Sequence, residues 1–430
     1  MQKLPCLLVL IWTAMLAPAA NAAERVEAIF EDAKQYTAYI ETRIEVPFIE
    51  DEQSSFFGAG FIINKDRRWI LTNAHVAGKS PAEIFVTFSD GTRVEAKPVY
   101  IDSYLDMAIL IYDKPDGLHL DEAKLECDKT PGIGHPVGTF GHPEGLQFTG
   151  TRGIISGRTS QYGSEWLQTD APISGGNSGG PLISLETGRV VGINSVTVLG
   201  DDAQNTNLAV LSTQACRIVE LMLNDQDPRP ADLGVVFFDD GYEPTTVVGQ
   251  VFARGQAIGL QRGDVILSVG GVQLERSTEG EVLHLLRGQF DQAEFQLIRA
   301  GQEIAVSASL APRPDIMDRI GVYVAGALFS VTNHLDITSL TLKPVVMVHS
   351  IESGSAAESA GIEDYDHLLG IDGRRITSLE DVIEAIEAHE PGTIAELDLV
   401  RFIYEENRFL GDVIAKIPLD DAEMISFPRE

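Results

Sequence analysis

Between Ser54 and Asn224 the hydrophobic residues come in short runs that end at glycine or at polar turns. These runs include FFGAGFIIN, WILTNAHV, EIFVTF, MAILIY, GRVVGINSVTV and TNLAVLS. Short runs rich in β-branched residues and separated by turn signals are typical of strands in a barrel or a sandwich. Helical periodicity appears at residues 26–34, ahead of the alternating YTAYIETRIEVPF, and again in TQACRIVELMLND. The pattern predicts a mainly β domain that a helix closes.

The rest of the chain contains one pattern twice. GDVILSVGG begins at Gly263 and YDHLLGIDG begins at Tyr365, an offset of 102 residues (365 − 263). Each copy precedes a helical pattern, EVLHLLRG in the first and EDVIEAIEAH in the second. Two copies at this spacing predict two tandem domains of one fold rather than a solenoid. The proline-containing stretch DQDPRPAD reads as the linker before them.

Composition and charge narrow the classes of function. Hydrophobic residues make up 44% of the chain and charged residues 22%, which is ordinary globular composition. The 64 acidic residues exceed the 32 basic residues, so the net charge is −32. A surface of this sign repels phosphate backbones, and we expect no nucleic-acid partner.

The N-terminus has the pattern of a secretory signal. Lys3 precedes an apolar stretch that ends in Ala20-Asn21-Ala22, which predicts cleavage near Ala22 and export to the periplasm or beyond. This stretch is short for a membrane span, and we expect no membrane-spanning segment in the mature chain. Cys127 and Cys216 remain after cleavage. In an oxidising compartment they either pair or stay as two buried thiols, and the sequence does not distinguish these alternatives.

The segment DAPISGGNSGGPL surrounds Ser178 with glycine. A serine hydroxyl becomes a nucleophile when a base takes its proton, and the acyl intermediate needs donors aimed at its oxyanion. Glycine permits the tight backbone bend that would expose both the serine hydroxyl and the backbone donors. The oxyanion hole is therefore predicted at Gly176, Asn177 and Ser178, with the amides of Gly176 and Ser178 as the donors.

A base and a carboxylate occur at two predicted strand ends. His75 lies in WILTNAHVAG, where a hydrophobic strand meets small residues, and Asp106 directly precedes the apolar run MAILIY. Taken alone, each residue is more often structural than catalytic. The order His75, Asp106, Ser178 in a β-rich region predicts a catalytic triad.

The motifs TNAHV, DMAIL and GNSGGPL, followed by the two repeats, resemble the HtrA/Deg family of serine proteases. The resemblance covers nearly all of the mature chain and implies a chymotrypsin-like double β-barrel followed by two PDZ domains. The domains are then a signal peptide at 1–22, a protease at 23–225 and PDZ domains at 226–312 and 313–424. It also implies cleavage of unfolded proteins without metal or cofactor, in a homotrimer or a larger homo-oligomer.

The chain departs from the family pattern at Gly141-His142-Pro143, where Asn-Pro is usual, and in the strand that begins at Asn207. The substrate pocket is predicted from three segments that contain no Asp or Glu, residues 171–174, 193–195 and 207–210, with Asp170 just before the first of them. The resemblance implies a preference for small aliphatic residues before the cleaved bond. The pocket residues expected are Ile173, Ile193, Asn194 and Leu208.

Each PDZ copy needs a glycine-containing loop before a strand to hold a peptide carboxylate. The first copy offers Leu233, Gly234 and Val235. In the second copy two loops compete, one at residues 320–323 and one at Gly326, Ala327 and Leu328, and the latter is preferred. The alternative is that the second copy only packs against its neighbours and binds no peptide. Elsewhere in the second copy, Tyr365 stands where the first copy has the turn glycine Gly263. Because non-glycine residues resist positive φ, a different turn is predicted at this position.

The sequence thus favours an exported serine endopeptidase that degrades unfolded or misfolded proteins. A chaperone-like PDZ scaffold with weak or no proteolysis is the alternative from another class. A regulatory protease dedicated to one substrate is a third reading, and the sequence does not exclude it.

Overall fold

The computed structural model describes residues 23–113, 117, 120–162, 164–197, 206–239, 244–332, 345–403 and 408–428. The predicted signal peptide, residues 1–22, lies outside the described residues. The chain divides into two compact units. One contains the described parts of Met1–Glu41, Phe57–Val76 and Phe85–Arg313, and the other contains Thr42–Phe56, Ala77–Ile84 and the described parts of Pro314–Glu430.

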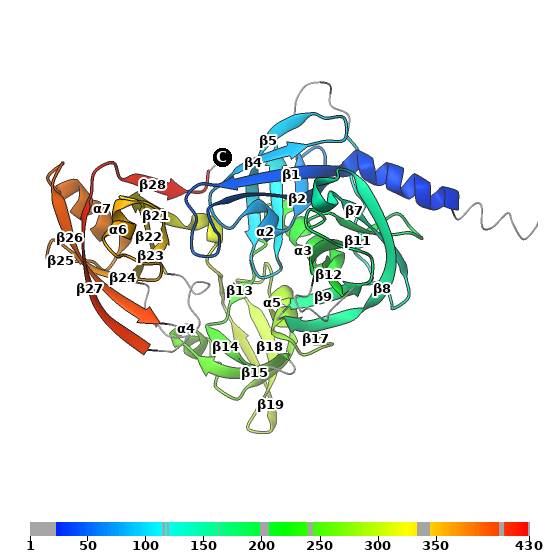
Figure 1. The fold of residues 1–430 in the computed structure, drawn as a ribbon. Helices are drawn as coiled ribbons and strands as arrows, with labels where there is room; N and C mark the ends of the chain where they lie inside the picture. Colours follow the sequence, from blue (N-terminus) through cyan, green and yellow to red (C-terminus); the bar gives the residue numbers. More distant parts are fainter. Residues whose placement is uncertain are drawn as a thin grey trace, which may run out of the picture. The chain divides into compact units, whose positions relative to one another are not determined.

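Six strands close into a first barrel in the order β1-β2-β3-β6-β5-β4 (Figure 1, blue to cyan). Residues 23–36 form the helix that precedes it, as predicted. The strand β3 is buried along its whole length, which explains its run of consecutive apolar residues. The strands are β1 (Thr37–Ile44), β2 (Ser54–Asn64), β3 (Trp69–Thr72), β4 (Glu83–Thr87), β5 (Arg93–Asp102) and β6 (Met107–Tyr112).

A second barrel follows in the order β10-β11-β12-β9-β8-β7. All five residues of β12 are buried, and the amphipathic helix α3 (Ser212–Leu223) ends the region at the predicted place. The double barrel confirms the predicted fold class. The strands are β7 (Pro136–Gly141), β8 (Thr149–Tyr162), β9 (Ser164–Thr169), β10 (Pro181–Ser184), β11 (Val190–Thr197) and β12 (Asn207–Leu211).

A disulfide joins Cys127, in the segment between the barrels, to Cys216 on α3. Their Cα atoms are 5.7 Å apart, within the range that a disulfide needs. Of the two alternatives that the sequence left open, the structure has the paired one. No helix among the described residues is long and apolar enough to cross a membrane.

The first repeat forms a sheet in the order β14-β15-β16-β18-β19, so β14 is an edge strand. A separate strand pair, β13 with β20, connects the beginning and the end of the repeat. Its elements are β13 (Ala231–Asp232), β14 (Val235–Asp239), β15 (Pro244–Val251), α4 (Ala253–Ala257), β16 (Val265–Val269), β17 (Val272–Gln273), α5 (Glu279–Leu285), β18 (Ala293–Arg299), β19 (Gln302–Ala308) and β20 (Ala311–Pro312).

The second repeat has the corresponding elements and adds strands at one side, in the order β27-β26-β24-β23-β22-β21-β28. Its elements are β21 (Ile320–Val324), β22 (Ala327–Val331), β23 (Val346–Ile351), α6 (Ala356–Ser359), β24 (His367–Ile371), β25 (Arg374–Arg375), α7 (Leu379–Ala388), β26 (Ile394–Ile403), β27 (Arg408–Pro418) and β28 (Glu423–Ser426).

The two copies share a buried ion pair that explains part of the sequence repeat. Asp264 binds Arg299 in the first copy and Asp366 binds Arg401 in the second, with the closest atoms 2.6 Å apart in both. The offset of both members is again 102 residues (366 − 264 and 401 − 299). A buried carboxylate needs such a partner, which accounts for the aspartate in each motif.

The prediction of a different turn at Tyr365 was wrong. Tyr365 has φ 68° and Gly263 has φ 87°, so both lie in the left-handed region. The amide of Tyr365 donates to the carbonyl of Val348 at 2.9 Å, as the amide of Gly263 does to that of Val248 at 2.8 Å. The surrounding hydrogen bonds therefore hold the second copy in the same turn despite the bulkier residue.

Candidate active site

His75 and Asp106 form a hydrogen-bonded pair. His75 lies in the short helix α2 (Ala74–Ala77) directly after β3, and Asp106 directly precedes β6 with φ 51°. The Nδ1 atom of His75 lies 2.8 and 3.0 Å from the two carboxylate oxygens of Asp106. The backbone amide of His75 also donates to Asp106 Oδ1, at 3.0 Å. Since Nδ1 donates to the carboxylate in this arrangement, Nε2 is left as the atom that can accept a proton.

Two residues that sequence reasoning missed hold Asp106 in place. The side chain of Asn73 donates to the backbone carbonyl of Asp106 at 2.8 Å. The hydroxyl of Ser195, on β11, donates to Asp106 Oδ2 at 2.7 Å. Ser195 was expected only as part of a segment near the pocket. Nothing in the linear sequence brings it to Asp106, because the two residues belong to different barrels.

Ser178 lies in a loop that hydrogen-bonds to backbone groups of both barrels. Its hydroxyl donates to the carbonyl oxygen of Ser195 at 3.3 Å, and its own carbonyl accepts from the amide of Ala59 at 2.8 Å. Ser195 therefore contacts both the candidate nucleophile and the candidate carboxylate. Ser195 thus connects Ser178 to the His75–Asp106 pair, and no hydrogen bond joins His75 to Ser178 among the described residues.

The glycines of this loop are required by close approaches. A Cβ atom at Gly176 would lie 2.1 Å from the carbonyl oxygen of His142, and one at Gly179 would lie 2.1 Å from that of Ala59. Both glycines also have positive φ, 97° and 82°. A side chain at either position would therefore push the loop away from the neighbouring strands.

Two amides of the loop are available as oxyanion donors. Among the described residues, the amides of Gly176 and Ser178 have no hydrogen-bond acceptor. The amide of Asn177 instead donates to the carbonyl of Ser174 at 3.0 Å. The inclusion of Asn177 in the predicted hole therefore needs correction, since its donor is already used within the turn.

The predicted pocket residues lie mostly in the interior. Ile193 and Asn194 have no exposed surface and Leu208 is buried, so of this set only Ile173 is partly exposed. The side-chain amide of Asn194 donates to the carbonyl of Pro181 at 3.2 Å. Ile193 and Asn194 thus pack in the interior beside the Ser178 loop and do not line an open pocket. The carboxylate of Asp170 is bound to the backbone, since its Oδ1 accepts from the amide of Ile154 at 2.7 Å.

The first repeat presents an edge strand beside its glycine loop. Leu233 is buried in the core, Gly234 has φ 60°, and β14 follows with Val236 and Phe238 exposed. Asp232 accepts from the amide of Gly234 at 2.8 Å and pairs with Arg254, on α4, at 2.6 Å. Arg254 places a cation at this loop, a feature that the sequence pattern did not reveal.

The second repeat differs at the equivalent strand. Gly326, with φ 86°, corresponds to Gly234. The carbonyl of Gly234 accepts from the amide of Phe252, directly after β15, and that of Gly326 accepts from the amide of Glu352, directly after β23. The strand β22 that follows is paired on both sides, with β21 and with β23. The preferred prediction of peptide binding at Gly326, Ala327 and Leu328 therefore fails, since no edge is left for an added strand.

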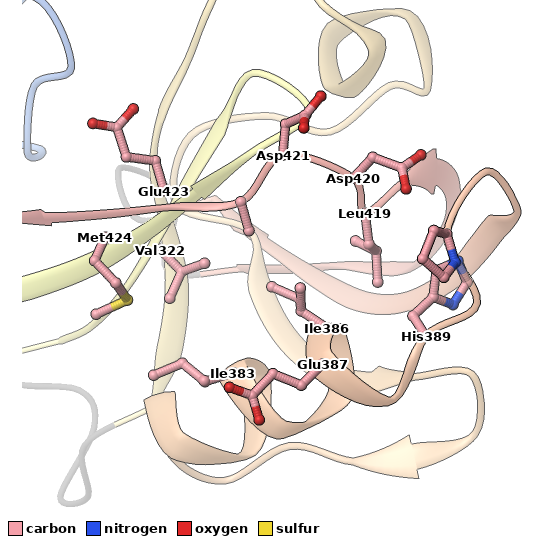
Figure 2. Close-up of a pocket in the computed structure, with 12 residues that line it drawn as sticks. Val322, Ile383, Ile386, Glu387, His389, Leu419, Asp420, Asp421, Glu423 and Met424 are labelled. Carbon is pink, nitrogen blue, oxygen red and sulfur yellow. The ribbon is translucent and has the colours of Figure 1, made fainter.

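The alternative strand of that repeat, β21, is occupied as well. The C-terminal strand β28 pairs with it antiparallel from Ile320 opposite Ser426 to Tyr323 opposite Glu423. A pocket of about 560 Å³ remains between α7, β21 and the segment that leads into β28. Figure 2 shows Ile383 and Ile386 of α7 facing Val322 and Met424 across it, with Glu387, Asp420, Asp421 and Glu423 also lining it.

Comparisons with known proteins agree with this architecture. A family model described as a trypsin-like peptidase domain matches residues 58–193, and a PDZ-domain model matches residues 328–408. A probable periplasmic serine endoprotease, DegP-like, from Pseudomonas putida is 31% identical over 361 residues, which is 77% of this chain and 74% of the relative. The equivalent protein from Chlamydia pneumoniae is 28% identical over 373 residues, 80% of this chain and 75% of the relative.

A solved structure supports the fold. The HtrA-type protease AlgW with decapeptide superposes with a TM-score of 0.53 at 24% identity. The match covers 67% of this chain and 99% of the solved chain.

Proposed function

The chain belongs to the family of DegP-like periplasmic serine endoproteases, and we propose that it hydrolyses peptide bonds through an acyl-enzyme formed on Ser178. The observation that carries this proposal is the contact of Ser195 with both Ser178 and Asp106, next to the His75–Asp106 pair. These contacts support the proposal because they link Ser178 through Ser195 to Asp106 and its partner His75. The proposed reaction further requires Nε2 of His75 to accept the proton of Ser178.

The candidate residues divide the steps of the proposed reaction among them. His75 takes the proton of Ser178 as the hydroxyl attacks the carbonyl carbon, and later gives it to the leaving amine. Asp106 orients the imidazole and stabilises its charged form. The amides of Gly176 and Ser178 donate to the oxyanion of the tetrahedral intermediate, where each such bond contributes about 10²–10³ in rate.

The proposed substrates are unfolded or misfolded proteins. We assign capture of a peptide terminus to the first repeat, because one edge of β14 pairs with no strand among the described residues and carries exposed apolar side chains beside Arg254. An added strand would pair with β14, and its terminal carboxylate would lie near the guanidinium. The second repeat is assigned no peptide, and the proposed assembly is a homotrimer or a larger homo-oligomer.

Export is proposed to occur by cleavage after Ala22, within a residue or so, to a mature protein that begins at Ala23. N-terminal sequencing of periplasmic material tests this step by itself. Material that begins at Met1 contradicts it without affecting the assignment of the active site.

The proposed function is tested by incubating casein, a largely unfolded protein, with the wild type and with Ser178→Ala. The wild type should release peptides and the variant should release none, with the same thermal unfolding curve for both. Equal digestion by both proteins contradicts the role of Ser178. Folded wild type that binds casein without cutting it instead favours the chaperone-like alternative.

A further inference from the structure

A short turn, residues 142–148, holds the candidate nucleophile loop through backbone contacts. The amide of Glu144 donates to the carbonyl oxygen of Gly175 at 2.8 Å, and the amide of His142 donates to that of Gly176 at 3.1 Å. The approach is close enough that only glycine fits at position 176. The turn and the loop therefore hold each other in one arrangement.

The bond from Glu144 fixes the direction of an oxyanion donor. In a trans peptide the carbonyl and the N–H point in opposite directions. The carbonyl of Gly175 and the N–H of Gly176 belong to one peptide unit. Because Glu144 holds the carbonyl, the N–H of Gly176 points away from the turn and finds no acceptor in the part of the chain that the structure describes. Rotation of this peptide unit would break the bond to Glu144 and remove the donor.

The turn itself has an unfavourable backbone. Glu144 has φ 51° and Phe148 has φ 56°, in a region that residues other than glycine rarely adopt. Two internal bonds support it, from Gly145 to His142 and from Leu146 to Pro143. Its far end is held by a side chain, since the amide of Phe148 donates to Nδ1 of His142 at 3.1 Å.

The His142 ring is built into the protein as an acceptor. It is fully buried, and its plane meets the rings of Tyr39 and Phe148 edge to face at 5.1 and 4.9 Å. An imidazole accepts at Nδ1 only when it is neutral, with its proton on Nε2. Burial lowers the pKa of His142 to about 4, so the ring is neutral at the pH of a periplasm.

We infer that His142 is a positioning residue of the oxyanion hole: its imidazole closes the 142–148 turn, and the turn fixes the Gly175–Gly176 peptide unit with its N–H toward the substrate. His142 does not touch substrate and acts through Phe148 and Glu144. The inference rests on the proposed function, because it assigns a further residue to the same reaction.

Two variants of similar shape distinguish the effect of the hydrogen-bond acceptor at position 142 from the effect of packing there. In His142→Asn the side-chain oxygen lies about where Nδ1 lies and can accept from Phe148, whereas His142→Leu has the same outline and no acceptor. Both lose the edge-to-face contact with Tyr39 equally. The readouts are kcat and KM on casein-derived peptides and the rate at which a fluorophosphonate probe reacts with Ser178.

We expect His142→Leu to lose at least about 10-fold in kcat and in the fluorophosphonate rate, since a misdirected oxyanion donor costs up to about 10²–10³. KM should stay within about 2-fold, and His142→Asn should keep both rates within about 3-fold of the wild type. Equal rates in the Asn and Leu variants, or a change in KM alone, overturn the inference. If the Leu variant does not fold, His142→Met replaces it with the same criteria, because a flexible thioether fills the site without a strong acceptor.

The two proposals fail in different ways. A wild type that cuts nothing and does not react with the probe contradicts the proposed function. A wild type that cuts casein, together with a Leu variant that cuts equally fast, contradicts only the role of His142.

Discussion

Single residues connect the candidate active site to the first repeat. Arg287, which follows α5, pairs with Asp102 at 2.6 Å, and the two side chains are 1% and 3% exposed. Asp102 Oδ1 in turn accepts from the amides of Tyr104 and Leu105 at 3.1 and 2.9 Å. These amides belong to the turn that precedes β6 and contains Asp106. A charged group of the repeat thus supports the backbone of the candidate catalytic carboxylate.

Replacing Arg287 with Met should destabilise the protein by about 3–5 kcal/mol, because it leaves Asp102 buried without its cation. Urea unfolding of the unit that contains both residues measures the loss. The double variant Arg287→Met with Asp102→Asn should regain part of the stability, since it removes the unpaired charge. A single variant within about 0.5 kcal/mol of the wild type would mean that water reaches Asp102.

The preference before the cleaved bond should be aliphatic and graded. No Asp or Glu occurs at residues 171–174, the predicted pocket segment that is partly exposed, and Asp170 is engaged by the backbone of β8. Without a pocket carboxylate, Lys and Arg gain no partner, and one methylene of mismatch changes the barrier by only about 1–3 kcal/mol. Mass spectrometry of casein fragments should find most cuts after Val, Ile or Ala. A majority after Lys, Arg, Phe or Tyr rejects this assignment.

Among single residues, the sequence singled out those with a distinctive local sequence around them. It missed residues whose role depends on tertiary contacts. Ser178 stands among glycines, and His75 and Asp106 stand at strand ends. Ser195 has no such marker, because its role depends on the side of β11 that it occupies next to the other barrel. For the same reason Ile193 and Asn194 were placed in a pocket, although both are interior.

Among the elements, the order of strands decides which repeat can take a peptide. The strand β14 lies at the edge of its sheet, whereas its counterpart β22 lies between β21 and β23. The sequence identified both repeats from one shared motif. It could not show that β21 pairs beside β22 or that β28 returns to pair with β21, because strand pairing between distant segments leaves no local pattern.

Two matched substitutions test this difference. Phe238 on β14 is 53% exposed and Met424 on β28 is 48% exposed, so Glu at either position should leave folding intact. Phe238→Glu should weaken binding of a hydrophobic peptide with a free C-terminus at least about 10-fold, because it places a charge beside an apolar peptide. Met424→Glu should leave binding unchanged. Calorimetric titration of inactive Ser178→Ala protein measures both, and a reversed result would assign capture to the second repeat.

Across the whole molecule, each of three folded regions contains a histidine whose pKa is lowered; His142 and His349 are buried, and His284 is half-buried. Burial lowers the pKa of His142 in the second barrel to about 4, that of His284 in the first repeat to about 4, and that of His349 in the second repeat to about 3. The positive charges of Arg287 and Arg217 add to the effect at His284, and that of Arg319 adds to it at His349. The native state thus holds all three neutral.

Stability should therefore fall as the pH drops from about 6.5 to 4. The unfolded chain takes up protons at these histidines near pH 6.5 and the native chain does not, so each contributes a loss of about 1.4 kcal/mol per pH unit in that window. Thermal unfolding across this range measures the slope. His284→Met should reduce the slope by about 1.4 kcal/mol per pH unit, because it removes one of the three titrating groups. The substitution breaks no hydrogen bond of His284 Nδ1, which has no partner among the described residues. An unchanged slope would show that His284 titrates normally.

The disulfide between Cys127 and Cys216 has a consequence for damage to the chain. The two cysteines are 89 positions apart, and the ring that they close contains Ser178, whereas His75 and Asp106 precede it. An endoprotease is exposed to its own copies, and a single nick inside the ring opens a loop without releasing a fragment. Both pieces stay covalently attached, so the nicked molecule keeps its second barrel beside the first. Such molecules migrate as one band without reductant and as two with it.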